Sequence, residues 1–142
     1  MIESFLLPIF LIIKQPKFIC MDNNTFIVKG FVKMYSGNQM DFNKTNSVDR
    51  KSYKVIAVEG VHKHNGSNEF DIKSLNSQYK IIKTNIKGEF DFELNPGVYT
   101  FFILKDDKLY LNNFDGLGNY SHIEVIDNVE NIIIRDYQNA YF

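Results

Sequence analysis

Alternating apolar and acidic positions form the clearest pattern in the chain. In the stretch Glu89-Phe90-Asp91-Phe92-Glu93-Leu94, three apolar residues alternate with three acidic ones, and this period of two predicts a half-buried strand. The tripeptide Asn95-Pro96-Gly97 follows, in which proline presets φ and glycine accepts the positive φ of a type II turn. Residues 98–104 are apolar on both faces apart from Thr100, which suits a central strand covered on each side. We therefore predict an antiparallel hairpin in which six residues form the centre of the core: Phe90, Phe92, Leu94, Tyr99, Phe101 and Ile103.

Shorter stretches of the same kind predict the other strands. They cover residues 25–35, 53–59, 79–86, 109–114, 122–126 and 131–135, with a short edge strand at residues 70–72. Gly30 lies inside the first of them and indicates a bulge or a close approach by a neighbouring backbone. The polar stretches 36–51 and 60–78 lack an apolar period and predict irregular surface segments. Since no amphipathic helix is predicted, seven or eight short strands favour an all-β sandwich or barrel.

Composition limits the classes of protein to which the chain can belong. A chain of 142 residues, 44% of them hydrophobic, suits one domain with one core. Its net charge of −1 provides no basic field to attract nucleic acid or an anionic membrane surface. Cys20 is the single cysteine, so no intrachain disulfide can form and a cysteine-based zinc site would lack its thiolates. The domain must be held together by packing.

The first twenty residues raise the question of export. Residues 5–13 are apolar, too few to span a bilayer as a helix but as long as the hydrophobic region of a signal peptide. Glu3 stands where a signal carries Lys or Arg, no small-x-small cleavage site precedes Cys20, and Ile19 replaces the small residue of a lipoprotein box. Three interpretations stay open: a degenerate signal or lipoprotein segment over residues 1–20 before a domain over residues 21–142, translation from Met21, or an extra strand packed on that domain.

Residues 83–100 carry a family motif, Thr-x-x-x-Gly-x-Phe ahead of Leu-x-Pro-Gly-x-Tyr. The matching residues are Thr84, Gly88, Phe90, Leu94, Pro96, Gly97 and Tyr99. On this motif the chain resembles a carboxypeptidase regulatory-like domain, and Val28-x-Gly30-x-Val32 resembles the first strand of that family. The stretches 108–120 and 136–142 are similar to a small subset of single-domain envelope proteins.

The resemblance implies a prealbumin-like, or transthyretin-like, Greek-key β-sandwich of about seven or eight strands. Such bacterial domains are usually exported and have no catalytic activity of their own, so the motif residues are expected to be structural. The expected location is the cell envelope or the medium, or the cytoplasm if translation starts at Met21. Hydroxyisourate hydrolases of the transthyretin type end in Tyr-Arg-Gly-Ser, whereas this chain ends in Asn139-Ala140-Tyr141-Phe142, which argues against that enzyme.

Few residues suggest chemistry. His62 and His64 would share one face of a strand and, with Glu69 or Asp71, could hold a divalent metal. Lys63 between them repels a cation and no third ligand is fixed, so ordinary solvated histidines are the favoured interpretation. The Gly-rich stretch 115–119 lacks the further oxygen ligands of a calcium loop. No Gly-x-Ser-x-Gly elbow, phosphate loop or dinucleotide motif occurs in the sequence, and we expect no cofactor.

Two functions remain from different classes. The first is a non-catalytic envelope module whose sandwich presents a surface to a protein or glycan partner. The second is a small enzyme or carrier of the transthyretin type that uses a cavity between the sheets or at a subunit interface. Phe102 and Leu104 would lie on the face of their strand opposite the core, where the apolar run near residues 10–13 or a second copy of the chain could cover them. They are therefore the predicted interface of a possible homodimer.

Overall fold

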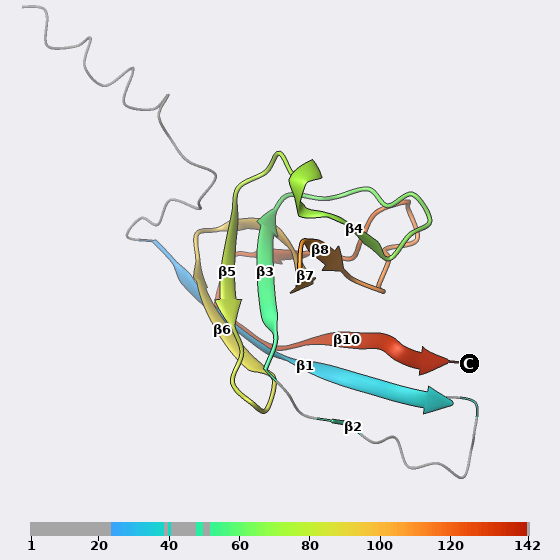
Figure 1. Ribbon diagram of the computed structural model, residues 1–142. Coiled ribbons are helices and arrows are strands. Elements are labelled where there is room, and N and C mark those ends of the chain that lie inside the picture. The colour runs from blue at the N-terminus through green and yellow to red at the C-terminus, as the bar shows by residue number, and fades with distance from the viewer. Residues whose placement is uncertain (1–23, 39, 41–47, 50–51, 142) are drawn as a thin grey trace, which may run out of the picture.

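Two β-sheets pack face to face in the computed structural model, which describes residues 24–38, 40, 48–49 and 52–141 (Figure 1). The four-stranded sheet contains β1 (Phe26–Asn38), β2 (Val48–Asp49), β6 (Glu89–Leu94) and β10 (Val129–Tyr141). The six-stranded sheet contains β3 (Lys54–Glu59), β4 (Glu69–Asp71), β5 (Tyr79–Lys83), β7 (Gly97–Lys105), β8 (Lys108–Tyr110) and β9 (Ile123–Val125). The predicted all-β sandwich is confirmed, whereas its Greek-key connectivity stays a prediction.

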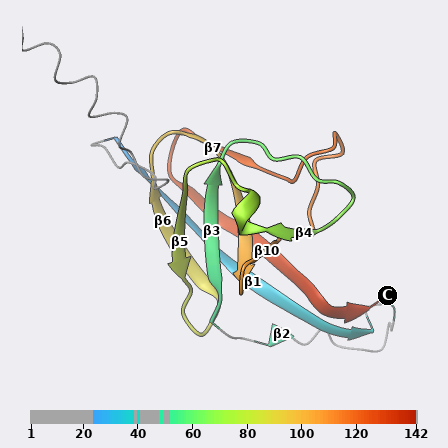
Figure 2. The same cartoon turned by 45° about the horizontal axis from the view of Figure 1, so that its top comes forward.

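The long strands β1 and β10 organise the four-stranded sheet. They run parallel to each other, and β6 and β2 pair antiparallel with successive parts of β1. The order in the other sheet is β4-β8-β7-β3-β5, with β9 beside the first residues of β7. The last residues of β1 and β10 run side by side beyond the rest of the sandwich, as both ribbon views show (Figures 1 and 2).

The predicted hairpin is wrong, because β6 and β7 belong to different sheets. β6 pairs with β1 and β7 pairs with β3, so Asn95-Pro96-Gly97 is a corner that carries the chain from one sheet to the other. Gly97 has φ of +154°, far from the value of about +80° that a type II turn requires. The hydroxyl of Tyr99 donates a 2.7 Å hydrogen bond to the Asn95 carbonyl and fixes this corner. The separation has a physical reason: the acidic face of β6 suits a sheet exposed on one side, whereas β7 needs cover on both faces.

The predicted core is confirmed even though its two strands are not paired. All six residues are buried, and the ring of Phe101 lies 5.6 Å from that of Phe92 and 6.3 Å from that of Phe90. Val28 and Val32 on β1 extend this layer from the four-stranded sheet, and Val55 extends it from β3. The two apolar faces therefore meet across the sandwich instead of lying side by side in one sheet.

The outer face of the six-stranded sheet is covered by the chain itself. Phe102 is 0% exposed, and its ring lies 5.2 Å from Phe70 and 5.1 Å from Tyr120 in edge-on contacts. A partner cannot reach Phe102, so its prediction as an interface residue is wrong. The sequence pattern missed this cover because Phe70 and Tyr120 stand as isolated aromatics in polar segments. Leu104 is partly buried against the core, and its role in an interface stays a prediction; residues 10–13 lie outside the described residues.

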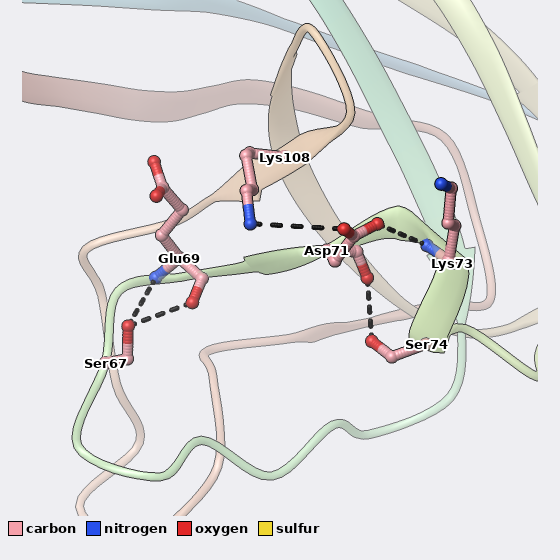
Figure 3. A network of polar contacts seen from close by, with 6 residues as sticks. All are labelled: Ser67, Glu69, Asp71, Lys73, Ser74 and Lys108. Carbon is pink, nitrogen blue, oxygen red and sulfur yellow. Dashed lines mark hydrogen bonds and ion pairs between the residues drawn. The ribbon is translucent and has the colours of Figure 1, made fainter.

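Polar contacts hold in place the segment from Ser67 to Ser74, which carries Phe70 (Figure 3). Asp71 accepts a 2.9 Å hydrogen bond from the backbone N–H of Lys73 at the start of a short 3₁₀ helix (Ile72–Ser74), and its carbonyl accepts one of 2.7 Å from Ser74 Oγ. The Nζ atom of Lys108 lies 4.0 Å from Asp71 Oδ2, which joins β8 to β4 through an exposed and therefore weak ion pair. The Ser67 hydroxyl donates a hydrogen bond to the carbonyl of Glu69 and accepts one from its backbone N–H.

No helix in the described part of the chain is long and apolar enough to cross a membrane.

Two glycines allow close packing around β1. The pairing of β1 with β10 shifts register between Val28 and Gly30, and a Cβ atom on Gly30 would overlap the carbonyl oxygen of Ile132. This confirms the bulge and close approach predicted at Gly30. Gly88 has φ of +78°, and a Cβ atom there would lie 2.7 Å from the Val32 carbonyl oxygen. Both positions therefore require glycine for a reason of space.

Two predicted boundaries are corrected by strand pairing. The polar segment 36–51 is not entirely a loop, because residues 36–38 continue β1 and Val48–Asp49 form β2; residues 41–47 lie outside the described residues. The last strand does not end at residue 135 but continues to Tyr141. Its polar end is held by backbone pairing with β1 out to Asn38, and such tertiary pairing overrides the weak strand preference of Asn and Gln.

Candidate functional site

The two histidines suggested by the sequence lie on the outer side of the six-stranded sheet. His62 Nε2 donates a 2.8 Å hydrogen bond to the carbonyl of Glu59, and His64 Nδ1 accepts one of 3.0 Å from the backbone N–H of Gly66. The ring of His64 also lies 4.2 Å from that of Phe114. Within the described residues, no group of three or more His, Cys, Asp or Glu side chains could hold a metal ion. Each imidazole ring is therefore hydrogen-bonded to backbone close to it in the sequence.

A cavity of about 400 Å³ lies beside these histidines. We call it the loop pocket, and its lining includes His62, His64, Ser67, Glu69, Phe70 and Tyr120. The hydroxyl of Tyr120 donates a 2.8 Å hydrogen bond to the Ser67 carbonyl, and burial raises the pKa of this phenol. Tyr120 is buried against Phe70 and Phe102. Its ring therefore belongs to the layer that covers the sheet and presents no face on which a ligand could stack.

A second hollow, of about 550 Å³, lies along β1 and β6. Charged side chains of both signs line it, among them Lys29, Lys83, Glu89 and Asp91. These side chains are exposed, and none of its lining residues is a buried polar group. Neither its charge nor its packing selects a particular ligand.

The motif residue Thr84 leads to a more organised place. Its Oγ1 accepts a 2.8 Å hydrogen bond from the backbone N–H of Tyr53, and its own N–H donates one of 2.8 Å to the Tyr53 carbonyl. The Ser52 hydroxyl also donates to the carbonyl of Thr84 at 2.8 Å. These bonds continue the pairing of β3 with β5 beyond Lys54 and Lys83. Thr84 is thus structural, as the resemblance implies, and the residue that it positions is Tyr53.

Tyr53 reaches a buried carboxylate on the opposite sheet. Its Oη donates a 3.0 Å hydrogen bond to Oδ2 of Asp136, which is 2% exposed. The other oxygen of Asp136, Oδ1, accepts 3.0 Å hydrogen bonds from both the backbone N–H and the side-chain Nε2 of Gln138. All three donors are uncharged, and no described lysine or arginine forms an ion pair with Asp136. Acidic side chains are seldom fully buried in proteins unless they are paired, which marks this end of the sandwich for closer attention.

Asp136 also influences a second buried tyrosine. Tyr110 accepts a 3.1 Å hydrogen bond at its hydroxyl from the backbone N–H of Tyr137. Burial raises the pKa of the Tyr110 phenol, the hydrogen bond from Tyr137 opposes this, and the charge of Asp136 raises it further. The phenol therefore stays protonated beside the carboxylate.

A cavity of about 310 Å³ is lined by Asp136. The first residue of β3, the last residues of β5 and β7, and further residues of β10 also line it. We call it the end pocket. Its polar lining comprises Ser52, Tyr53, Lys54, Lys83, Lys105, Asp106, Asp136, Gln138 and Asn139, with Ile103 and Leu104 as its apolar part. Six of these eleven residues are exposed, so the pocket opens to solvent. Its volume lies at the lower end of the range for small-molecule sites, and its lining is more polar than is usual for them.

Three exposed lysines line the end pocket. Lys54 stands directly opposite Lys83 in the antiparallel pairing of β3 and β5, an arrangement of like charges that destabilises a sheet. Lys105 contributes a third ammonium group and Asp106, in the turn after β7, a carboxylate. Within the described residues, none of the three lysines forms an ion pair.

The sequence contained a signal for Asp136 that the prediction missed. Asp136 has the same strand parity as Ile132 and Ile134, so it continues the face that packs on the core. An acidic residue on the buried parity of a strand is unusual and points to a satisfied or functional carboxylate. The prediction ended the strand at residue 135 and therefore gave Asp136 no face.

The chain was compared with protein-family models, with curated proteins and with solved structures, and none of the three comparisons gives a match. The resemblance to a carboxypeptidase regulatory-like domain therefore rests on the sequence motif alone and stays a prediction.

Proposed function

We propose that the protein is a non-catalytic binding module of the bacterial cell envelope whose β-sandwich presents a surface to a protein or glycan partner. The observation that carries this proposal is the end pocket, in which side chains from both sheets meet around Asp136. The envelope location is supported by the motif of residues 83–100 and its resemblance to exported domains.

The character of the end pocket favours a glycan over a protein partner. Its accessible side chains, such as Lys54, Gln138 and Asn139, carry hydrogen-bonding groups at their ends, and sugar hydroxyls are recognised by such groups. The apolar residues that line the pocket, Ile103 and Leu104, are not exposed, whereas the central patch of a protein interface is built on exposed aromatic or aliphatic anchors.

One observation also supports the carrier alternative. The end pocket is lined by residues of both sheets, among them the buried Tyr53 and Asp136. A carrier of the transthyretin type would use an intersheet cavity. Both candidates require a ligand to bind at the same place, so they differ in whether the bound molecule is part of a larger glycan or free.

A glycan array tests the proposal with the full chain detected through an antibody tag, so that no lysine of the end pocket is modified. We expect retention of one related group of glycans, and loss of that retention when Gln138→Ala and Asn139→Ala alter the mouth of the end pocket. Lys87→Ala is the matched control, because Lys87 is exposed and does not line the pocket. Fractionation of the cells that make the protein tests its location. Absence of binding to any glycan, together with recovery in the soluble cell contents alone, would overturn the proposal.

A further inference from the structure

We propose that the end pocket binds a small sugar-like ligand through an oxyanion, a carboxylate or a phosphate group, held by Lys54 and Lys105. This inference rests on the proposed function and names the chemical class of its ligand. Four features of the pocket support it: the cross-strand pairing of two lysines, the hydrogen bonds that already occupy Asp136, the number of available N–H donors, and the volume of the cavity.

The lysines are placed against their own repulsion. Lys54 and Lys83 are direct cross-strand neighbours, and Lys105, the last residue of β7, lines the same cavity. Lys83 also borders the hollow that contains Glu89 and Asp91, yet no ion pair with them forms among the described residues. Like charges that face one another across a strand pair destabilise the free protein, and an anion between them would remove this cost.

The acids of the pocket do not neutralise these lysines. Both oxygens of Asp136 are already occupied by Tyr53 Oη and by the two nitrogens of Gln138, and Asp136 is buried while the lysines are exposed. Asp106 is the other acid in the lining. Three lysines and two acidic residues thus line the pocket, and the carboxylate of Asp136 is fully engaged by neutral donors.

The remaining capacity of the pocket is for donating hydrogen bonds. Each ammonium group offers three N–H donors, and the Asn139 amide makes only a weak 3.9 Å contact with Met34 Sδ. Oxyanions accept strong charge-assisted hydrogen bonds from lysine, whereas a cationic ligand would meet repulsion. A cavity of about 310 Å³ has room for one sugar unit with its hydroxyls.

Isothermal titration calorimetry on the full chain tests this inference with three probes: methyl glucuronide for the carboxylate, glucose 6-phosphate for the phosphate and methyl glucoside as the neutral analogue. We expect one or both acidic probes to bind and the neutral one to bind at least about tenfold more weakly, because a charge-assisted bond is lost. Lys54→Gln and Lys105→Gln should each weaken binding about tenfold, and Lys87→Gln should not. In the absence of ligand, Lys54→Gln should also leave the urea midpoint unchanged or raise it, because it relieves the repulsion with Lys83.

Three results would overturn the inference: no binding by either acidic probe, equal binding of the neutral probe, or equal losses in Lys87→Gln and Lys54→Gln. The glycan array separates this failure from that of the proposed function. If array binding persists in Lys54→Gln and Lys105→Gln, the protein is a glycan-binding module without an oxyanion site. If the array shows no binding at all, the proposed function fails as well.

Discussion

Tyr53 Oη donates a 3.0 Å hydrogen bond to Asp136 Oδ2 and so joins the two sheets at one end of the sandwich. Tyr53 stands one residue before β3, and Asp136 lies on β10. Both side chains are buried, so the bond is made out of water, where an unpaired partner is costly. Both residues also line the end pocket.

Removing this hydroxyl should destabilise the fold. Tyr53→Phe leaves Oδ2 of Asp136 without a donor, and we expect a loss of about 1–3 kcal/mol in the free energy of unfolding. Urea denaturation measures it. Tyr79→Phe is the control, because the Tyr79 hydroxyl forms no hydrogen bond among the described residues and this side chain is only partly buried. Equal losses in the two variants would show that the Tyr53–Asp136 bond contributes nothing of its own.

Gly88 and Gly66 allow backbone space to be separated from backbone conformation. Their φ angles are +78° and +79°, but a Cβ atom on Gly88 would lie 2.7 Å from the Val32 carbonyl, whereas one on Gly66 would have no neighbour within 4 Å. Gly88→Ala should therefore cost more than Gly66→Ala by about 1–3 kcal/mol, the usual effect of overpacking. Paired urea melts give the difference. Similar midpoints would mean that β1 and the turn before β6 are farther apart than described.

Phe102 tests the self-covered outer face. Phe102→Glu would place a charge where no water or cation can reach it, and we expect the variant to unfold instead of changing its association state. Leu117→Glu, at a position that is 84% exposed, should melt like the parent chain. Circular dichroism and light scattering together give the answer. A folded Phe102→Glu variant with half the mass of the parent would restore the predicted homodimer interface.

Alkaline pH should weaken the fold through Tyr110. Burial first, and then the charge of Asp136, raise the pKa of this phenol above its usual 10.0. Between the usual and the raised pKa the folded protein keeps a proton that the unfolded chain has released, so stability is complete below about pH 10 and falls as the pH rises further. Tyr110→Phe should reduce the slope of stability against pH in this window. An unchanged slope would assign the whole alkaline loss to other groups, among them Tyr120, whose pKa is also raised.

The contrast between β6 and β7 shows what the sequence can and cannot predict. Alternation identified Phe90, Phe92 and Phe101 as core residues, because the period of two depends only on which face is buried. It could not say whether the two strands pair or face one another, since both arrangements bury the same residues. The Asn95-Pro96-Gly97 signal predicts a change of direction, and a corner between sheets satisfies it as well as a hairpin does.

The candidate site was less predictable than the fold. Thr84 was identified by its motif, but its partner Tyr53 lies 31 positions away, and nothing local links the two residues. Asp136 and Lys105 line the same pocket although they lie on strands of different sheets. A site assembled from the ends of several strands leaves no spacing pattern in the sequence, whereas the histidines at positions 62 and 64 show such a pattern but are tied to their own loop.

Binding of a ligand at the end pocket is tested most directly by an NMR titration of the ¹⁵N-labelled full chain with methyl glucuronide and with glucose 6-phosphate. We expect the largest amide shift changes on residues that line this pocket, such as Lys54, Lys105 and Gln138, and only small changes around His62 and His64. Largest changes at the loop pocket, or no changes with either probe, would contradict it.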